Sequence, residues 1–463
     1  MPPNDPETSA PLPSSSKSFP SKTSLPPGSA PHVPPSPLSR LKSVYFSVFI
    51  DVLGIGLVIP VLPYLILSFE GAGASEVGFV IAFYSLCQVP GSFIFGAISD
   101  RKGRRPVLLL SIFASSLSFL LCGLAKTLPM VIIARGFSGL TGGSISVAQA
   151  YVADVTTVEE RPKYLGLIGA TIGIAFTFGP GIGAATAAIV EANGGDIQLQ
   201  YSAVFFLASA FGLLGFIFAL KNLEETSLPT DKASTEVKAS VERSLLLPIL
   251  IISFSMFSSN FGFTVMQSTY GVLITDEYDW STKALGLILV VSGLEIAVLQ
   301  GKIVKVIVQK IGKHVSGFIG CALLGLGLAC LPLTLWSKPV HLFSFAVQVA
   351  GFSVTQTALP ALLSRYASKD SQGSVLGFGQ AAQAASRVVA PLVSGVLYDN
   401  SEKLIGMEYA APYLLGGILS VVSGLPLLGL LNDRRLEKGV VEDEDEDEGD
   451  EMIRVEEGDD DRL

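Results

Sequence analysis

Four ionisable side chains lie inside long apolar stretches of this 463-residue chain: Asp51, Arg135, Glu295 and Arg387. A charge near the middle of a bilayer costs at least about 2.5 kcal/mol, so each should face a cavity or a charged partner. A carboxyl group in such surroundings can gain and lose a proton, whereas a guanidinium stays charged. Asp51 and Arg135 have similar estimated depths and can pair if their helices face each other. We expect both to take part in proton or substrate coupling; a purely structural ion pair is the alternative.

The other acid and base, Glu295 and Arg387, differ in estimated depth by roughly 10 Å, so the sequence does not require them to pair. If they are unpaired, Arg387 can bind an anionic group of a substrate, and Glu295 can bind a proton or a cation. A structural ion pair is the alternative for these two residues.

Polar, uncharged side chains recur along the same apolar stretches. We expect them to line a central cavity, and hydrogen bonding between helices is the alternative for each. They are Tyr84, Gln88, Gln149, Asn260, Gln267, Gln348 and Gln356. No pairing of a nucleophile with a base, no metal-ligand spacing and no phosphate-binding loop is evident. We therefore expect neither an enzyme nor a bound metal or cofactor.

Membrane-spanning helices must position these side chains. The chain is 49 % hydrophobic and 15 % charged, with a mean hydropathy of +0.54, whereas soluble proteins carry roughly 25 % charged residues. About 20 apolar residues cross a bilayer as a helix. Twelve such stretches occur, near 43–69, 76–98, 106–125, 128–153, 163–189, 200–220, 245–274, 284–304, 313–335, 339–364, 372–397 and 408–431.

A short turn between the second and third stretches is dense in charge. Its glycine and ionisable positions are Gly96, Asp100, Arg101, Lys102, Gly103, Arg104 and Arg105. Short loops rich in Lys and Arg stay on the cytosolic side of a membrane. The pattern Gly-x-x-Ser-Asp-Arg-x-Gly-Arg-Arg resembles the signature loop between helices two and three of the major facilitator superfamily. A basic loop that only sets the topology is the alternative.

This resemblance implies an all-α polytopic membrane protein with the major facilitator fold: twelve transmembrane helices in two pseudo-symmetric six-helix bundles. It implies that Asp100 faces the start of the eleventh span when the protein faces outward. It also implies that Arg104 pairs with Asp154, so that the turn and Asp154 form a gate.

Three further patterns resemble the tetracycline-resistance type of proton-coupled drug antiporter. Asp51 begins an Asp-x-x-Gly-x-Gly-x-x-x-Pro-x-x-Pro pattern with an acid at the family's position, and Arg135 matches a fourth-helix motif linked to proton transfer. The fifth stretch resembles the antiporter motif, although Ala175 and Ala184 replace two of its glycines; generic helix packing is the alternative. The matching positions of that motif are Gly166, Gly179, Pro180 and Gly183.

The chain divides into five parts. We expect a disordered Pro/Ser-rich arm at 1–40, an N-terminal bundle at 41–221, a linker at 222–244, a C-terminal bundle at 245–432 and a disordered acidic tail at 433–463. Residues 440–463 carry a net charge of −12, which leaves +3 for the rest of the chain. Lys and Arg concentrate on the side of the charged turn, so both termini are predicted to be cytosolic.

The sequence also contains a weak internal repeat, with an offset of roughly 210 residues. Gly103 maps onto Gly312, Pro180 onto Pro391, and Asp51 close to Asn260. Two halves related by duplication are typical of transporters that move a solute between them.

These patterns together predict a secondary active transporter that exports a small organic solute in exchange for protons. A proton symporter or a facilitator is the alternative, and a membrane receptor or scaffold acting through its tails is an alternative of another class. The expected partners are a small-molecule substrate, protons and the lipid bilayer. We expect a monomer that binds no nucleic acid, and no address motif names the membrane in which it resides.

Overall fold

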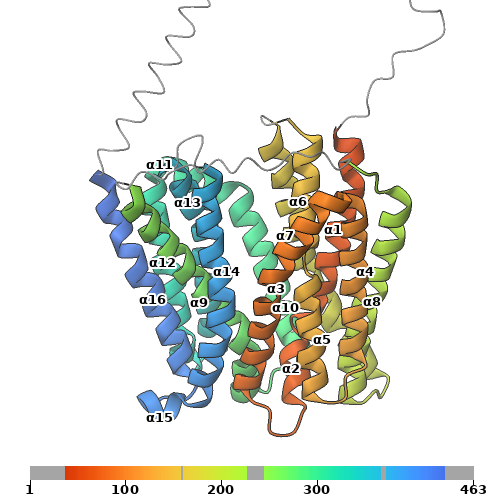
Figure 1. Cartoon of the computed structure of the whole chain (residues 1–463). Coiled ribbons are helices and arrows are strands. Elements are labelled where there is room, and N and C mark those ends of the chain that lie inside the picture. The colour runs from red at the N-terminus through yellow and green to blue at the C-terminus, as the bar shows by residue number, and fades with distance from the viewer. Residues whose placement is uncertain (1–36, 158–159, 227–244, 367–371, 433–463) are drawn as a thin grey trace, which may run out of the picture.

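The computed structural model describes residues 37–157, 160–226, 245–366 and 372–432, and all regular structure in these ranges is helical (Figure 1). The N-terminal half contains α1 (Pro37–Val58), α2 (Leu62–Leu67), α3 (Ala74–Lys102), α4 (Arg104–Gly123), α5 (Leu128–Thr141), α6 (Ser144–Val155), α7 (Arg161–Ala192) and α8 (Ile197–Asn222). The C-terminal half contains α9 (Leu246–Tyr278), α10 (Thr282–Val298), α11 (Val304–Ile311), α12 (Lys313–Cys330), α13 (Lys338–Leu363), α14 (Gln372–Asp399), α15 (Ser401–Ile405) and α16 (Ala410–Gly429). The π-helical turn Leu299–Ile303 joins α10 to α11.

Eleven helical segments of the described residues are long and apolar enough to cross a membrane, and α5 and α6 together make one of them. Helix α14 has 28 residues, which is also long enough. Its hydropathy is low because its sequence includes Gln380, Gln383, Ser386 and Arg387. With α14 the helices match the predicted twelve spans, and the chain is an integral multi-pass membrane protein.

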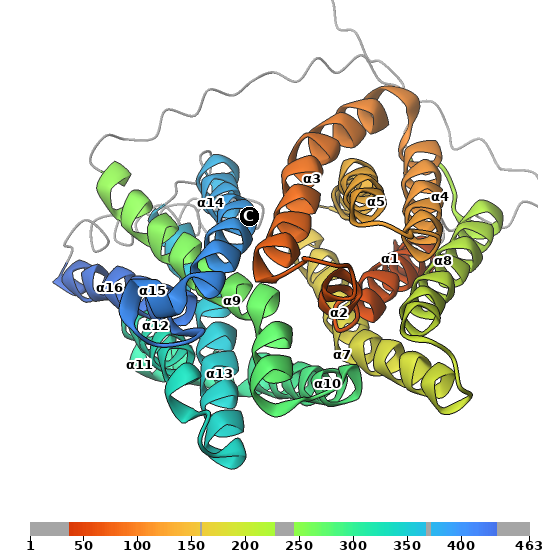
Figure 2. The ribbon, with the colours of Figure 1, turned by 90° about the horizontal axis from the view of Figure 1, so that it is seen from below.

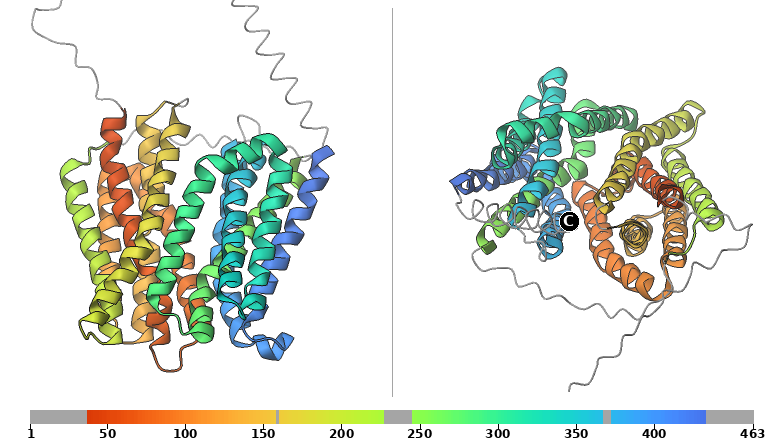
Figure 3. Two further views of the ribbon diagram at one scale, coloured as in Figure 1. Left: turned by 180° about the vertical axis from the view of Figure 1, so that it is seen from behind. Right: turned by 90° about the horizontal axis from the view of Figure 1, so that it is seen from above.

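The helices form two bundles that lie side by side (Figures 1 and 3). Seen from below, α3 lies beside α14, and α7 lies beside α10, so these four helices connect the bundles (Figure 2). We call the end that carries the start of α1 and the turn at Gly103 the basic end. The opposite end, which carries α2 and α15, is the distal end (Figure 1).

The internal repeat is visible in the backbone. Gly103 joins α3 to α4 with φ 96° and ψ 158°, and Gly312 joins α11 to α12 with φ 83° and ψ 158°. Both backbone conformations lie at positive φ, which a side chain with a Cβ rarely adopts. The two halves therefore make the same turn at equivalent places, as the predicted duplication requires.

The predicted first and fourth spans are present, but their helices differ in detail from simple continuous spans. Helix α1 begins at Pro37 and not after residue 40, because a proline at the first position of a helix lacks only an N–H that would be unpaired there. The predicted continuous fourth span, 128–153, is broken at Gly142 and Gly143 into α5 and α6, since adjacent glycines interrupt a helix at low cost.

All four cysteines are in the described residues and are free thiols. The acidic tail at 433–463, most of the Pro/Ser-rich arm and linker residues 227–244 lie outside the described residues.

Candidate functional site

The buried carboxylate of Asp51 lies at the break between α5 and α6. Its side chain is 4 % exposed, and its Oδ2 atom accepts a 2.5 Å hydrogen bond from Ser144 Oγ. Ser144 is the first residue of α6, so the carboxylate lies at a helix N-terminus, where unpaired N–H groups favour a negative charge. The other oxygen, Oδ1, is buried and receives no hydrogen bond from the described residues. Asp51 therefore has one fixed partner and one oxygen that is free to take a proton.

Arg135 does not form the predicted ion pair with Asp51. Its guanidinium lies over the ring of Tyr84, with 4.4 Å between the Arg135 Cζ atom and the ring centroid, and its Nε atom is buried without a hydrogen-bond partner among the described residues. The Tyr84 hydroxyl accepts a 3.2 Å hydrogen bond from Gln88 Nε2. A cation above an aromatic face is favourable, and this explains how Arg135 tolerates burial at 6 % exposure.

Tyr84 lies near charged side chains of both bundles. Arg135, Asp51 and Arg387 all lie close enough to act electrostatically on its hydroxyl. Arg387 belongs to α14 of the C-terminal bundle, whereas the other two belong to the N-terminal bundle. Three of the four predicted coupling residues, Asp51, Arg135 and Arg387, therefore surround Tyr84, although in the described residues no two of them form an ion pair.

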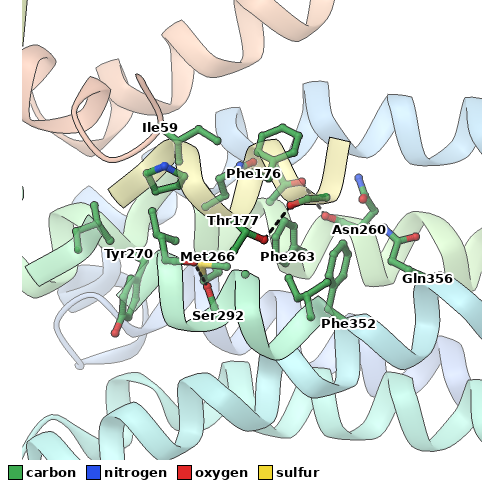
Figure 4. A pocket seen from close by; sticks show the side chains of 18 of the residues that line it. Ile59, Phe176, Thr177, Asn260, Phe263, Met266, Tyr270, Ser292, Phe352 and Gln356 are labelled. Carbon is green, nitrogen blue, oxygen red and sulfur yellow. Dashed lines mark hydrogen bonds between the residues drawn. The ribbon is translucent and has the colours of Figure 1, made fainter. Parts of the chain in front are cut away.

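A cavity of about 510 Å³ lies between the two bundles. Its walls come from α7, α9, α10, α13 and α14, with Ile59 and Pro63 at one edge. The largest apolar side chains that line it are Phe176, Phe263, Met266, Tyr270 and Phe352 (Figure 4). Pockets of this size and apolar character hold drug-sized molecules.

The polar wall of the cavity is a hydrogen-bonded network of α9, α13 and α14. Asn260 Nδ2 donates to Ser386 Oγ at 2.7 Å and to the Gln383 carbonyl at 3.1 Å. Gln383 Nε2 donates to Gln356 Oε1 at 3.3 Å. Arg387 follows Ser386 and lines the cavity. Asn260, the repeat partner of Asp51, is 5 % exposed, so both halves place a buried polar residue here.

Of the residues predicted to line the cavity, Asn260, Gln267 and Gln356 do so. Tyr84 and Gln88 instead pack around Arg135, and Gln149 is exposed on α6. Gln348 is fully buried, with both of its polar side-chain atoms unpaired in the described residues. The sequence marked these residues as polar, but the direction of each side chain depends on how its helix is rotated.

Glu295 is half-buried on α10 and does not line the cavity. It has no ion pair with Arg387 or with any other described residue. Of the second predicted pair, only Arg387 therefore reaches the space between the bundles.

The charged turn forms a cluster at the basic end. Arg104 pairs with Asp100 through Nη1 at 2.5 Å and with Asp154 through Nε at 2.8 Å. The contact with Asp154 is the one expected from the sequence. The Asp100 side chain is 64 % exposed, and in the described part of the chain its ion-pair partner is Arg104. The expected contact with the start of the eleventh span falls at 367–374, where no side chain is described.

Sequence reasoning missed Glu225, which completes this cluster. Its Oε1 atom accepts from the backbone N–H of Arg104 at 2.8 Å, and both carboxylate oxygens accept from Arg105 N at 3.3 Å. Helix α4 starts with two arginines and has no side-chain cap of its own. This missing cap was the feature of the sequence that could have indicated an acidic partner from elsewhere in the chain. Glu225 supplies the cap from the end of the N-terminal bundle.

The distal end is closed by contacts between the bundles that the sequence did not reveal. Asp399, at the end of α14, accepts hydrogen bonds from Ala74 N at 3.2 Å, from Ser75 N at 2.9 Å and from the Ser75 hydroxyl. Lys283 of α10 pairs with Glu191 of α7 at 3.2 Å. Asp399 thus caps the N-terminus of α3 from the opposite bundle.

At the basic end the same helices stand apart. A Cβ atom added at Gly96 of α3, Gly173 of α7, Gly301 beside α10 or Gly377 of α14 would meet no neighbouring atom within 4 Å. At the distal end, by contrast, Gly78 of α3 lies directly against the Pro391 carbonyl of α14. The cavity therefore opens toward the basic end.

The glycine motif of α7 packs that helix against α1. A Cβ at Gly179 would lie 2.7 Å from the Gly56 Cα atom, and one at Gly183 would overlap the Leu57 carbonyl. Pro180 lines the cavity, and Gly166 has no neighbour within 4 Å. Three of the four motif residues therefore lie where α7 meets α1 or the cavity.

Two helical bundles around a central cavity that is closed at one end define a membrane transporter. The chain belongs to the Major Facilitator Superfamily, whose model matches residues 44–391. No cluster of His, Cys, Asp or Glu that could hold a metal ion occurs among the described residues.

Two relatives match most of the chain. It is 28 % identical over 372 residues to the class B tetracycline resistance protein of Escherichia coli, which covers 78 % of this chain and 89 % of that protein. It is 27 % identical over 356 residues to multidrug resistance protein 1 of Bacillus subtilis, which covers 76 % and 88 %. As a member of this superfamily, the chain is a transporter and not an enzyme, as the sequence predicted.

The fold is also that of solved transporters. A crystal structure of a D-xylose–proton symporter superposes with a TM-score of 0.65 at 19 % identity, covering 84 % of this chain and 96 % of that one.

Proposed function

We propose that this transporter exports a small organic solute in exchange for protons, and that its cavity opens alternately to the two sides of the membrane. The relatives named for tetracycline and multidrug resistance support export. Proton coupling is supported by the surroundings of Asp51, a buried carboxylate with one hydrogen-bonded oxygen and one oxygen without a hydrogen-bond partner among the described residues.

We further propose that the basic end faces the cytosol. Ten of the cations whose side chains are described lie at this end: Lys42, Arg101, Lys102, Arg104, Arg105, Lys221, Lys305, Lys310, Lys313 and Arg365. The distal loops carry Lys126, Lys283, Lys338 and Lys403. This bias supports a cytosolic location of both termini. The cavity would then be open to the cytosol, which is the state that loads a solute for export.

In the proposed cycle, Asp51 binds a proton from the outer side and releases it to the cytosol. Arg135 stays over the ring of Tyr84 and forms no ion pair with Asp51 in this state. In the outward-facing state the distal contacts of Asp399 break, and Asp100 meets the start of the eleventh span. We propose a monomer as the working unit.

Transport into everted membrane vesicles tests this proposal. The vesicles are given an acidic lumen, and the uptake of ethidium, tetracycline and naphthalenesulfonate is followed as a cationic, a zwitterionic and an anionic probe. We expect at least one probe to accumulate in the vesicles. An ionophore that collapses the pH gradient should abolish this accumulation. Asp51→Asn should remove the dependence on the gradient, because an amide cannot carry the proton.

Glu70→Gln is the matched control, since it removes an exposed carboxylate near the distal end. It should leave uptake unchanged. Uptake that ignores the gradient would instead identify a facilitator. Uptake that needs an alkaline lumen would identify a symporter, and either result overturns the proposed antiport.

A further inference from the structure

We propose that the transported solute is an organic anion whose acidic group binds Arg387 and whose apolar body lies against the aromatic side chains of the cavity. This inference rests on the proposed transport function and names its substrate class.

Arg387 is the only charged side chain among the described residues that line the cavity. The other polar groups there are hydroxyl and amide side chains, including Thr177, Asn260, Ser292 and Gln356. Its guanidinium has no ion pair with any described residue. The cavity therefore presents one uncompensated positive charge to whatever enters it.

The two predicted intramembrane acids do not neutralise this charge. Asp51 is enclosed in the N-terminal bundle and bonded to Ser144, and Glu295 lies outside the cavity. Tyr84 is the group that acts electrostatically on Arg387 from the opposite bundle, and it is neutral. A guanidinium that is exposed in a cavity with mainly apolar walls favours an anion over a cation.

A second hydrogen-bond donor lies in the same wall. Gln356 Oε1 accepts from Gln383 Nε2, an assignment taken from the hydrogen-bond network. This leaves the amide N–H groups of Gln356 available to the cavity. Arg387 and Gln356 both line the cavity and offer only donors to it, which matches a carboxylate or sulfonate and not a cationic amine.

The rest of the cavity fits a flat apolar group. The rings of Phe263 and Phe352 are stacked, with 3.8 Å between their centroids and 8° between their planes. Figure 4 shows Asn260 and Gln356 together at one end and Tyr270 at the other, with Phe263 and Phe352 between them. A ring system with an acidic group at one end can therefore contact the aromatic wall and the polar wall together.

Equilibrium binding to the purified full-length protein in lipid nanodiscs tests the inference. Three probes share one ring system: naphthalenesulfonate is an anion, naphthalenesulfonamide is neutral and naphthyltrimethylammonium is a cation. We expect calorimetry to show that the anion binds at least about tenfold more tightly than the cation. Arg387→Gln should remove this preference.

Two further variants separate charge from packing. Arg387→Lys keeps the charge without the planar fork, so it should retain the preference for the anion with weaker binding. Gln356→Leu should weaken binding of the anion and leave the cation unaffected. Lys310→Gln is the matched control, because it removes an exposed cation outside the cavity and should change nothing.

Equal binding of anion and cation to the parent protein would overturn the proposal, and so would a preference that survives in Arg387→Gln. Failure of naphthalenesulfonate to bind also counts against it, because the cavity is large enough for this probe. Binding requires no pH gradient, so anion selection can hold while proton coupling fails, and the two proposals are tested separately.

Discussion

Removal of the Asp399 carboxylate should open the distal end. Asp399 links the end of α14 in one bundle to the start of α3 in the other, through hydrogen bonds from Ala74 N, Ser75 N and the Ser75 hydroxyl. These bonds exist only while the bundles touch at this end. Their loss therefore destabilises the present state relative to the outward-open one.

The size of the effect follows from the chemistry of a helix cap. Replacement of a capping aspartate by alanine costs about 0.5–2 kcal/mol, and the negative charge at the N-terminus of α3 adds about 0.3–1 kcal/mol. The exposed position of Asp399 favours the lower half of this range. A loss of about 1–2 kcal/mol shifts the balance between the two states by roughly 5–30-fold.

Distance measurements between spin labels can detect such a shift. One label is placed at Gly71, between α2 and α3, and the other at Lys403 on α15, because both positions are exposed. The background lacks the four native cysteines, none of which forms a disulfide. In Asp399→Ala we expect the population with the longer separation to grow at the expense of the shorter one.

Glu402→Ala is the matched control. Glu402 is an exposed carboxylate on α15, and its side chain forms no ion pair with a described residue. It should leave the distance distribution unchanged. If Asp399→Ala gives the same distribution as Glu402→Ala, the cap does not hold the distal end closed and the reasoning is refuted.

Two further predictions concern stability. Glu225→Ala removes the cap of α4 and should lower the thermal unfolding midpoint by an amount equivalent to about 0.5–2 kcal/mol. Glu224→Ala, which changes the exposed neighbouring residue, should leave the midpoint unchanged. Equal midpoints in the two variants would contradict the assigned cap. Gly183→Ala should destabilise the protein by about 1–3 kcal/mol, because the added methyl group overlaps the Leu57 carbonyl. Gly166→Ala in the same motif should leave stability unchanged or raise it, since no neighbour lies within 4 Å of the added methyl group. A similar loss of stability in both variants would contradict the close packing of α1 and α7.

Much of the architecture could be predicted from the sequence because it depends on local properties. The length of each apolar stretch sets the number of spans, and the charges between stretches set where they end. The pair Arg104–Asp154 was expected from the resemblance of the charged turn to the signature loop of the superfamily. The fourth span was predicted at the correct place, but its break at Gly142 and Gly143 was not, because a glycine pair permits a break without requiring one.

The site was predicted only in part. Asp51, Arg135 and Arg387 were marked by their charge, and Asn260, Gln267 and Gln356 were assigned correctly to the cavity. The aromatic wall was not predicted, since a phenylalanine in a membrane helix can face lipid, the core or a cavity. Glu225 and Asp399 were missed because each caps a helix that is distant in sequence.

The sequence alone determined which charges enter the membrane, how many helices carry them and where the chain turns. The tertiary structure decided that Arg135 lies over Tyr84 and not against Asp51, that Arg387 and not Glu295 reaches the cavity, and which end of the cavity is open. Each residue along a helix turns its side chain by about 100°, so a small rotation of a helix exchanges one partner for another. Hydropathy fixes the depth of a side chain in the membrane, but only the packing of neighbouring helices fixes its direction.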